Sequence, residues 1–442
     1  MKRIDIAGLK IDAVTKKQLL DILAKRITEG QKTFLTTPYS EFLHAALANP
    51  AIMETLNQAD LAVADGIGLF WAKRFLDLPL TAKSYWAKIL QAFWQAKYTL
   101  AAIIFRPAYI RSTLPEKIPG SDLIWDLIEL VADKNLSIYL LGGFGDTPKL
   151  AANKLQTTSY KLKIAGYSNK NPGDPTAIED IKKASPDLLF VAYGPIKQER
   201  WIAQNLPNLP VKLAVGLGGT FDYLAHKQPQ PPRFWRQAGL EWLWRLLTQP
   251  RRARRIFNAT FGLANEVLLF KIYTQLPWRK NAVSVILNAQ GQVLVCRRNP
   301  EPKRDDAVGE DIKKFRDYWQ LPQGGIEPGE DLEAGTKREV LEETGLTNLR
   351  LIGVSKLTHS YWFPLSWKRI LVKRWHFRGQ IQNILFFQHQ GNDSDVKIDQ
   401  SEFVDYRWIA TRDLVSTINP EKKNLVKLVV TELKNLEEKV II

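Results

Sequence analysis

The chain has 442 residues, 45% of them hydrophobic and 24% charged, so it can form two or three globular cores and is not a disordered chain. Its formal net charge of +16 favours partners that carry phosphate over basic ones. A single cysteine, Cys296, excludes an internal disulfide and fits a reducing cytoplasm. Because Cys296 lies in a strand-like run, we expect a small core residue there and not a nucleophile.

The first half of the chain alternates between short apolar strands and amphipathic helices. Strands are predicted within 3–12, 33–39, 61–65, 137–143, 161–167, 187–194 and 212–219, and helices over 16–30, 40–59 and 120–134. This alternation predicts an α/β domain with a Rossmann-like, largely parallel sheet that helices cover on both faces.

One segment of this half, 85–105, is rich in aromatic and aliphatic residues. Lys88 and Lys97 interrupt it, so it does not qualify as a membrane span. An interfacial helix and a buried helical insertion are both consistent with the pattern.

A basic stretch follows, from Lys227 to Lys280, in which only Glu241 and Glu266 oppose the lysines and arginines. Helical patterning runs through 240–276 and ends at Pro277. Such a stretch attracts phosphate groups on nucleotides, RNA or an anionic membrane, and a solvated basic face is the alternative.

After Pro277 the pattern becomes that of an α+β domain. Residues 282–298 predict a hairpin with its turn at Asn288–Gly291, further strands are predicted at 376–389 and 403–410, and a helix is predicted at 423–439. We therefore divide the chain into domains 1–275 and 279–442.

An acidic helix in this second domain indicates metal chemistry. Glu339, Glu342 and Glu343 lie at i, i+3 and i+4 before a stop at Gly345, so their carboxylates share one helix face. Magnesium prefers such oxygens together with substrate phosphates. A solvated acidic face is the alternative.

The full segment "GGIEPGEDLEAGTKREVLEETGL", with Gly324, Glu330, Arg338 and Gly345 at fixed positions, resembles the Nudix box. "WQLPQGG", "YWFP" and "RGQIQNILFF" resemble the subgroup of RNA pyrophosphohydrolases and diadenosine polyphosphate hydrolases. The resemblance implies a Nudix fold that cuts a diphosphate linkage in a nucleotide or at an RNA 5′ end. It further implies that Mg²⁺, or Mn²⁺, binds Glu339, Glu342, Glu343 and Glu402, and that Glu342 is catalytic. Arg338 and Glu330 would brace the loop, and Arg297 and Tyr361 would contact the substrate. The stretch 301–318 is longer than in the subgroup, and we interpret it as a mobile lip.

In the first domain, glycine turns follow three predicted strands, at "GGFGDTPK", "YGPIKQE" and "GLGGTFD". Turns of this kind at one sheet edge indicate a nucleotide crevice. Asp65 occupies a fourth such turn, where it either caps a helix or takes a proton from an acceptor hydroxyl.

The motifs "ADLAVADGIG", "IPGSDLI", "DLLFVAYGPIKQERWI", "VGLGGTFDYLA" and "AGLEWLWRLLTQPRRARR" together resemble the WecG/TagA/CpsF glycosyltransferase family. The resemblance implies a UDP-N-acetylmannosamine-type donor, a polyprenyl-diphosphate N-acetylglucosamine acceptor and no metal. It assigns Asp65 as base, and Thr37 and Gln198 to the catalytic site. The expected substrate contacts are Gly142, Gly143, Lys197 and Gly218. It also implies that Arg245–Arg255 faces an anionic membrane, so that the protein is peripheral on the inner face of the cell membrane.

Several positions depart from that family's pattern. Tyr39 replaces Asn, Lys117 replaces Arg, Pro195 and Ile196 are swapped, His226 stands where Gly is common, and the insertion at 80–112 is long. The leading hypothesis is a bifunctional enzyme. A non-catalytic, nucleotide-sugar- or membrane-binding first domain and a Nudix domain that only regulates the transferase are the alternatives. No oligomeric state is predicted.

Overall fold

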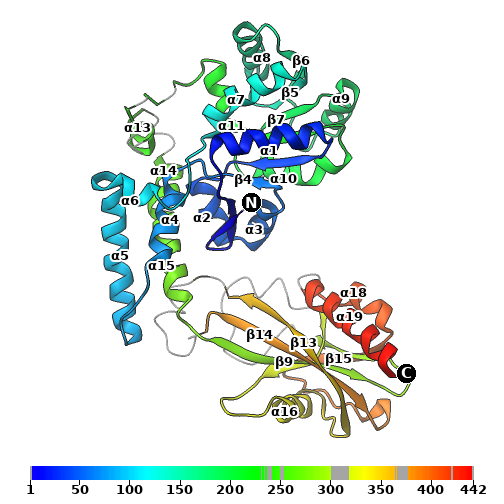
Figure 1. The fold of residues 1–442 in the computed structure, drawn as a ribbon. Coiled ribbons are helices and arrows are strands. Elements are labelled where there is room, and N and C mark those ends of the chain that lie inside the picture. The colour runs from blue at the N-terminus through cyan, green and yellow to red at the C-terminus, as the bar shows by residue number, and fades with distance from the viewer. Residues whose placement is uncertain are drawn as a thin grey trace. The chain divides into compact units, whose positions relative to one another are not determined.

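The computed structural model describes residues 2–229, 231–232, 234–235, 241–248, 253–299, 318–363, 365, 377–419 and 422–440. The chain forms two compact units, one built from Met1–Tyr273 and the other beginning at Thr274. Figure 1 shows the elements of both.

The first unit is built on a six-stranded parallel sheet, which confirms the predicted α/β class. Its strand order is β4 (Leu61–Ala62), β3 (Thr33–Thr36), β8 (Leu213–Gly216), β7 (Leu188–Ala192), β5 (Ser137–Gly142) and β6 (Lys163–Ser168). Because every pair is parallel, all carboxyl ends meet at one edge, where ligands of such sheets bind.

Helices cover both faces of this sheet, as predicted (Figure 1). Leu140 and Phe190 point to one face and pack with α1 (Lys16–Thr28), α7 (Gly120–Asp133), α8 (Thr147–Thr158) and α11 (Gly218–Leu224). Leu141 and Val191 point to the other and pack with α9 (Thr176–Ala184), α10 (Lys197–Asn205) and the 3-10 turn η1 (Leu206–Asn208). The alternation follows from the two-residue period of a strand.

Two expectations for this unit are wrong in detail. Residues 3–12 do not join the main sheet but form a separate antiparallel hairpin of β1 (Arg3–Ile6) and β2 (Leu9–Asp12). The predicted helix 40–59 is divided into α2 (Ser40–Ala48) and α3 (Pro50–Asn57). Pro50 cannot continue a helix, and the Asn49 side chain caps α3 by accepting the Ala51 N–H at 3.0 Å.

The rest of the first unit is helical. It comprises α4 (Ile67–Asp77), α5 (Tyr85–Phe105), α6 (Pro107–Arg111), α13 (Glu241–Thr248), α14 (Ala253–Phe257), the π-helical turn η3 (Asn258–Gly262) and α15 (Leu263–Tyr273). The predicted segment 85–105 is thus one helix, and it packs against α4 and α15. Among the helices that the structure describes, none has both the length and the apolar content needed to cross a membrane.

The second unit holds a seven-stranded mixed sheet, which confirms the α+β prediction. Its main order is β11 (Trp319–Gln320), β10 (Val293–Arg298), β9 (Trp278–Leu287), β14 (Gly379–His389) and β13 (Leu349–Trp362); β12 (Gln323–Gly325) pairs with β9 and β15 (Phe403–Ile409) with β10. Only the β9–β14 pair among them is parallel.

Helices cover both faces of the mixed sheet. The helices α18 (Leu414–Thr417) and α19 (Lys423–Val440) pack on one face, and α16 (Leu332–Thr344) packs on the other. Short 3-10 turns lie at η6 (Asp393–Asp395) and η7 (Thr411–Asp413). Cys296 is fully buried in the core beneath α16, and burial raises its pKa, as expected of a packing residue.

Candidate active sites

A cavity of about 710 Å³ opens at the carboxyl edge of the parallel sheet. Among the residues that line it are most of those predicted for this domain: Thr37, Asp65, Gly143, Lys197, Gln198 and Gly218. Gly142 lies at the end of β5, directly before the lining residue Gly143. The turns after β3, β4, β5, β7 and β8 therefore converge on one site.

Thr37 and Asp65 meet at the start of α7. The Asp65 Oδ2 atom accepts the Gly120 N–H at 3.2 Å. A Cβ atom on Gly120 would lie 3.2 Å from Thr37 Oγ1 and 3.7 Å from Asp65 Oδ2, so glycine leaves this space open. The helix that follows Asp65 in sequence, α4, has Gly66 as its N-cap and no side-chain cap. Asp65 therefore lines the cavity and also accepts the N–H of the first residue of α7.

Gln198 is held by a buried neighbour, Glu199. The Gln198 amide accepts the Gly218 N–H at 3.2 Å and donates to Glu199 at 2.9 Å. The second Glu199 oxygen accepts the Ile196 N–H at 2.8 Å. Complete burial raises the pKa of Glu199 to about 7, against the lowering effect of these hydrogen bonds. Sequence reasoning missed Glu199, whose position next to Gln198 in "PIKQER" was the available signal.

Backbone geometry explains two of the glycines. Gly142 has φ +93°, and a Cβ there would lie 2.9 Å from the carbonyl carbon of Ala192. Gly143 has φ +87°, again in the region that favours glycine. In the next turn Ile196, one of the swapped residues, has φ +68°, which strains a β-branched side chain.

Two departures from the family pattern contact the helical segment after the sheet. Lys117 Nζ lies 2.9 Å from the Glu241 carboxylate. The Tyr39 hydroxyl donates to Glu41 at 2.8 Å and accepts from Arg255 at 2.9 Å. All of these residues line the cavity. Of the predicted membrane-facing stretch, Arg251, Arg252 and the Arg245 side chain lie outside the described residues.

One end of the cavity is apolar. Leu100, Ile103 and Ile104 from α5 line it, together with Phe261 and Leu263 from η3 and α15. The cavity therefore joins a polar sheet edge to an apolar wall.

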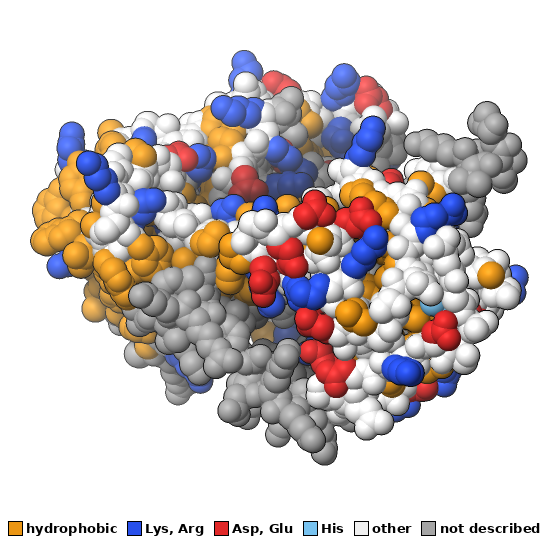
Figure 2. All heavy atoms as spheres, turned by 90° about the horizontal axis from the view of Figure 1, so that it is seen from below, with side chains coloured by type: hydrophobic (Ala, Val, Ile, Leu, Met, Phe, Trp, Pro, Cys, Tyr) orange, Lys and Arg blue, Asp and Glu red, His pale blue; other side chains and the backbone are white. Residues whose placement is uncertain are grey.

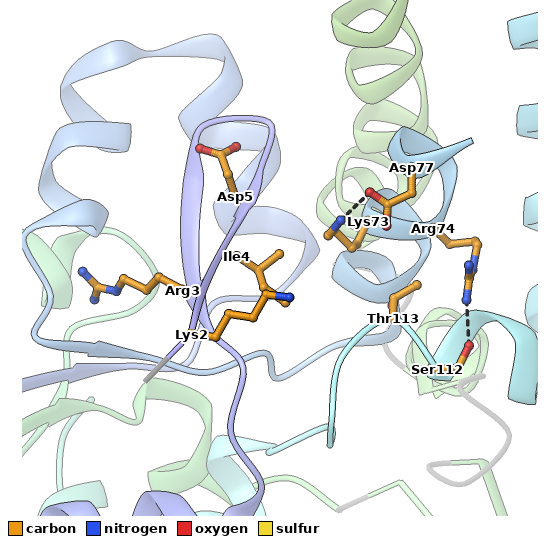
Figure 3. A pocket seen from close by; sticks show the side chains of 9 residues that line it. All are labelled: Lys2, Arg3, Ile4, Asp5, Lys73, Arg74, Asp77, Ser112 and Thr113. Atoms are coloured by element: carbon orange, nitrogen blue, oxygen red, sulfur yellow. Dashed lines mark hydrogen bonds and ion pairs between the residues drawn. The ribbon is translucent and has the colours of Figure 1, made fainter. Parts of the chain in front are cut away.

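A second hollow of about 380 Å³ lies between β1 and α4, and several of its charged side chains have partners (Figure 3). Lys73 pairs with Asp77, and Arg74 donates to Ser112 Oγ at 2.6 Å. Arg3 pairs with Asp12 at 3.0 Å. The lining of this hollow includes none of the predicted site residues.

In the second unit, Arg338 binds the loop before α16 to the helix. Its guanidinium donates to both Glu330 oxygens at 2.9 and 3.0 Å and to the Gly325 carbonyl at 3.0 Å. The hydrogen bonds from Arg338 lower the pKa of Glu330 to about 2. The helix itself begins after Asp331, which caps it, and ends at Gly345 with φ +71°.

The predicted metal-binding glutamates separate into two groups. A Cβ on Gly324 would lie 1.8 Å from Glu339 Oε2, so this carboxylate lies directly against the glycine. Glu343 is buried and accepts the Gln323 N–H at 2.9 Å; burial first, then the charges of Glu402 and Glu339, raise its pKa. Glu342 instead has a side chain that is 61% exposed and lies 3.3 Å from Arg338. Glu339, Glu343 and Glu402 thus interact beside β12, while Glu342 points outward.

These residues fit a divalent cation. Among the described residues no three acidic, His or Cys side chains converge as a finished ligand set, and Arg338 pairs with Glu339 at 2.7 Å and with Glu342 at 3.3 Å. The donors are nevertheless the hard oxygens that Mg²⁺ prefers. The missing Cβ of Gly324 lets the Glu339 carboxylate lie against the backbone of β12, and the buried Glu343 lies among like charges that a cation would neutralise.

Several basic side chains act electrostatically in the region of these carboxylates. The Tyr361 hydroxyl donates to Gln380 at 2.6 Å, and burial raises its pKa while the charges of Arg279 and Arg298 oppose the rise. Lys422 interacts electrostatically with Arg298 and Glu343. The charge of Arg298 therefore acts in this region, and the substrate contact predicted for Arg297 stays a prediction. Residues 300–317, which hold most of the predicted lip, lie outside the described residues.

A parallel α/β unit with a carboxylate at its sheet edge, followed by a mixed-sheet unit with a glutamate-rich helix, defines a chain of two enzyme domains. The model of the glycosyl transferase WecG/TagA/CpsF family matches residues 4–105 and 101–276, and the NUDIX domain model matches 277–429. The chain belongs to the WecG/TagA/CpsF family and carries a NUDIX domain, which confirms both resemblances.

Known proteins resemble each part. The N-acetylglucosaminyldiphosphoundecaprenol N-acetyl-beta-D-mannosaminyltransferases of Staphylococcus aureus strains MRSA252 and NCTC 8325 are each 25% identical over 260 residues, covering 58% of this chain and 88% of the relative. The MutT protein of Methanosarcina mazei Go1 is 21% identical, with 36% of this chain and 98% of that chain covered and a TM-score of 0.26. The C. elegans Ap4A hydrolase complex is 16% identical, with 35% and 98% covered and a TM-score of 0.24.

Proposed function

We propose that the first unit transfers an N-acetylmannosamine-type sugar from a UDP-sugar to a hydroxyl of a polyprenyl-diphosphate-linked N-acetylglucosamine. The observation that carries this proposal is the meeting of Asp65 and Thr37 at Gly120, in a cavity with one polar and one apolar end. The names of the Staphylococcus aureus relatives support the acceptor and the sugar.

In this mechanism Asp65 takes the proton of the acceptor hydroxyl as that oxygen attacks the anomeric carbon of the donor. The bond from that carbon to the diphosphate breaks, and UDP leaves with the bonding electrons. Gln198 orients the donor, and Lys197, Arg255 and the N–H groups of the glycine turns are the donors available to the leaving diphosphate. No metal takes part.

The test is transfer by Asp65→Asn with UDP-N-acetylmannosamine and a lipid-linked acceptor. Loss of the base should lower the rate about a thousandfold. Asp133→Asn, an exposed carboxylate at the end of α7, is the matched control and should keep the wild-type rate. Wild-type protein that binds the donor but transfers with no UDP-sugar would favour the alternative, a binding module.

We propose that the second unit hydrolyses a diphosphate linkage in a nucleotide or at an RNA 5′ end. Glu339, Glu343 and Glu402 would hold Mg²⁺, or Mn²⁺, with Glu342 as base. The bound metal supplies polarisation of the phosphate and activation of a water. Arg279, Arg298 and Lys422 neutralise the remaining phosphate charge, and Arg338 fixes the loop that carries Gly324.

A panel of nucleoside triphosphates, dinucleoside polyphosphates and 5′-triphosphorylated RNA tests this proposal on the intact chain. Glu343→Gln should reduce Mg²⁺-dependent phosphate release about a hundredfold or more and weaken Mn²⁺ binding in a titration. Glu333→Gln is the matched control, because Glu333 lies on the first turn of α16 and pairs with Lys337. Unchanged turnover in Glu343→Gln would contradict the metal assignment.

The acceptor's lipid also indicates where the protein works. A polyprenyl-diphosphate remains in the bilayer, so we infer that the chain acts on the cytoplasmic side, peripheral to the inner face of the membrane. The excess of basic residues agrees with an anionic surface as a partner.

A further inference from the structure

Helix α5 has its bulky apolar side chains on the outside. The face that packs on α4 and α15 is made mostly of small residues, Ala92, Ala96, Thr99 and Ala102. The opposite face exposes large ones: Trp86 (52%), Leu90 (64%), Phe93, Trp94 (69%), Tyr98, Leu100, Ile104 and Phe105 (80%). A helix that borders water has the reverse distribution.

This exposed face is a continuous patch. Trp86, Leu90, Trp94 and Tyr98 follow one another at i+4 intervals, so they form one stripe along the helix. Figure 2 shows hydrophobic side chains gathered at the left of the view, on the side where Figure 1 places α5. Scattered apolar residues need no explanation, but a contiguous patch of this kind indicates a binding surface.

The charge along the α5 segment itself is of one sign. From Leu78 to Pro115 the sequence holds Lys83, Lys88, Lys97, Arg106 and Arg111 and no Asp or Glu. Lys97 Nζ lies 5.2 Å from the centre of the Trp94 ring, and Arg106 donates to the Tyr98 hydroxyl at 2.9 Å. Cations beside aromatic rings on one helix face are typical of a helix at the boundary between lipid headgroups and acyl chains.

We propose that the α5 face is a docking surface for an anionic lipid bilayer, on which the helix lies in the plane of the membrane. Since its small-residue face is packed on α4 and α15, only the aromatic face is available to the lipid. The lysines and arginines then meet the headgroups, while the Trp, Leu and Phe side chains enter the apolar layer.

Docking in this way would also serve the transferase site. Leu100, Ile103 and Ile104, in the last turns of α5, line the apolar wall of the cavity. A membrane-seated α5 therefore brings that wall to the surface that holds a lipid-linked acceptor. This consequence rests on the proposed transfer reaction, whereas the docking surface itself does not.

The test uses the full chain and vesicles made of equal parts phosphatidylglycerol and phosphatidylcholine, or of phosphatidylcholine alone. Wild type should co-sediment with the anionic vesicles, and less so at high salt. The double variants Leu90→Gln/Trp94→Gln and Lys88→Glu/Lys97→Glu should each lower the partition coefficient about tenfold or more. None of these four residues lines the cavity.

Matched controls remove similar groups elsewhere in the first unit. Tyr160→Gln removes an aromatic side chain that is 88% exposed, and Lys182→Glu/Lys183→Glu reverses two exposed charges on α9. Both should bind vesicles as wild type does, and Trp94→Phe should largely restore binding over Trp94→Gln.

Equal vesicle binding by wild type and the α5 variants would overturn the proposal. A second outcome would also overturn it: light scattering finds that the wild type self-associates, the apolar double variant is a monomer, and neither protein binds vesicles. The α5 face would then bind a second copy of the chain and not a bilayer. Transfer to a short-chain, water-soluble acceptor separates the two proposals. If the α5 variants keep that activity and lose only turnover of vesicle-borne acceptor, docking is supported. If wild type transfers to neither acceptor, the transferase proposal fails and the sedimentation result still decides docking.

Discussion

At the scale of single residues, Glu199 is a buried carboxyl whose role depends on its protonation. Its pKa in the folded chain is about 7, above its ordinary value, because no solvent reaches it. A raised pKa means that the folded state favours the neutral form. Its contribution to stability is therefore complete below the unfolded pKa and is lost as pH rises through about 7, at a cost of about 3 kcal/mol.

We therefore expect hydrogen exchange in peptides from β7 and β8 to accelerate between about pH 5 and about pH 7.5, and to level off above that range, beyond the intrinsic pH effect. Glu199→Gln should remove this additional dependence, since an amide does not titrate in that range. The variant can be less stable at pH 6, because an amide offers only one acceptor to the Ile196 and Gln198 donors. Parallel pH dependence in wild type and variant would show that Glu199 is not the group responsible.

His226 stands where the family commonly has Gly, and its backbone conformation is unfavourable for a residue with a side chain. It follows α11 with φ +54°, and the Lys227 and His226 N–H groups bond to the carbonyls of Asp222 at 2.9 Å and Tyr223 at 3.1 Å. This is the Schellman arrangement, whose left-handed residue is normally glycine. His226→Gly should stabilise the first unit by about 1 kcal/mol in denaturant unfolding. Ala225→Gly, one residue earlier at φ −76°, is the control and should destabilise it by about 0.5–1 kcal/mol.

Two features of the site in the second unit could not be predicted from the sequence. The spacing predicts that Glu339, Glu342 and Glu343 share one helix face. It does not predict which of them packs against β12, because the helical period gives the direction of each side chain around the helix and not the residues that it contacts. Arg298, which was not predicted for the site, acts through its charge on Tyr361, and the role of Arg297 stays a prediction. A register shift of β10 between Arg297 and Arg298 interrupts the strand alternation there, and no residue pattern signals it.

At the scale of elements, the loop before α16 and the helix are joined by one guanidinium. Arg338 reaches Glu330, Gly325, Glu339 and Glu342, and a lysine offers a single ammonium in place of that planar fork. Arg338→Lys should therefore lower Mg²⁺-dependent hydrolysis about tenfold to a hundredfold and speed hydrogen exchange in residues 323–331.

Lys337→Gln is the control for this element, because Lys337 lies on the same helix. Among the ion pairs that the structure describes, Lys337 takes part in one, the surface pair with Glu333. It should leave both measurements as in wild type. Arg338→Lys with normal exchange but lost hydrolysis would mean that the arginine contacts substrate and does not brace the loop.

Elements were predicted well where their period was clean. Five of the six strands of the parallel sheet fall within predicted segments, β6 ends one residue beyond its segment, and α5 matches the predicted range 85–105. The β1–β2 hairpin was misassigned because its alternation equals that of a sheet strand, and its turn is Ala7–Gly8, both at positive φ. The exposed face of α5 could not be read from sequence, since which side packs depends on small residues that meet α4 and α15.

At the scale of the whole molecule, the two proposed activities draw on separate residues. Each compact unit has its own sheet and its own buried clusters. Asp65 and its partners belong to the first, and the glutamates of α16 belong to the second. Such independence argues against a Nudix domain that acts only as a regulator of transfer.

We therefore expect Asp65→Asn to keep Mg²⁺-dependent hydrolysis, and Glu343→Gln to keep transfer, each within about twofold of wild type. Both reactions should be measured on the intact chain, with the substrate of the other reaction present and absent. A regulatory Nudix domain would make the opposite prediction: Glu343→Gln, or a Nudix substrate, would change the kcat or KM of transfer. If each rate is the same with and without the other substrate, the shared chain links the two enzymes physically but does not couple their kinetics.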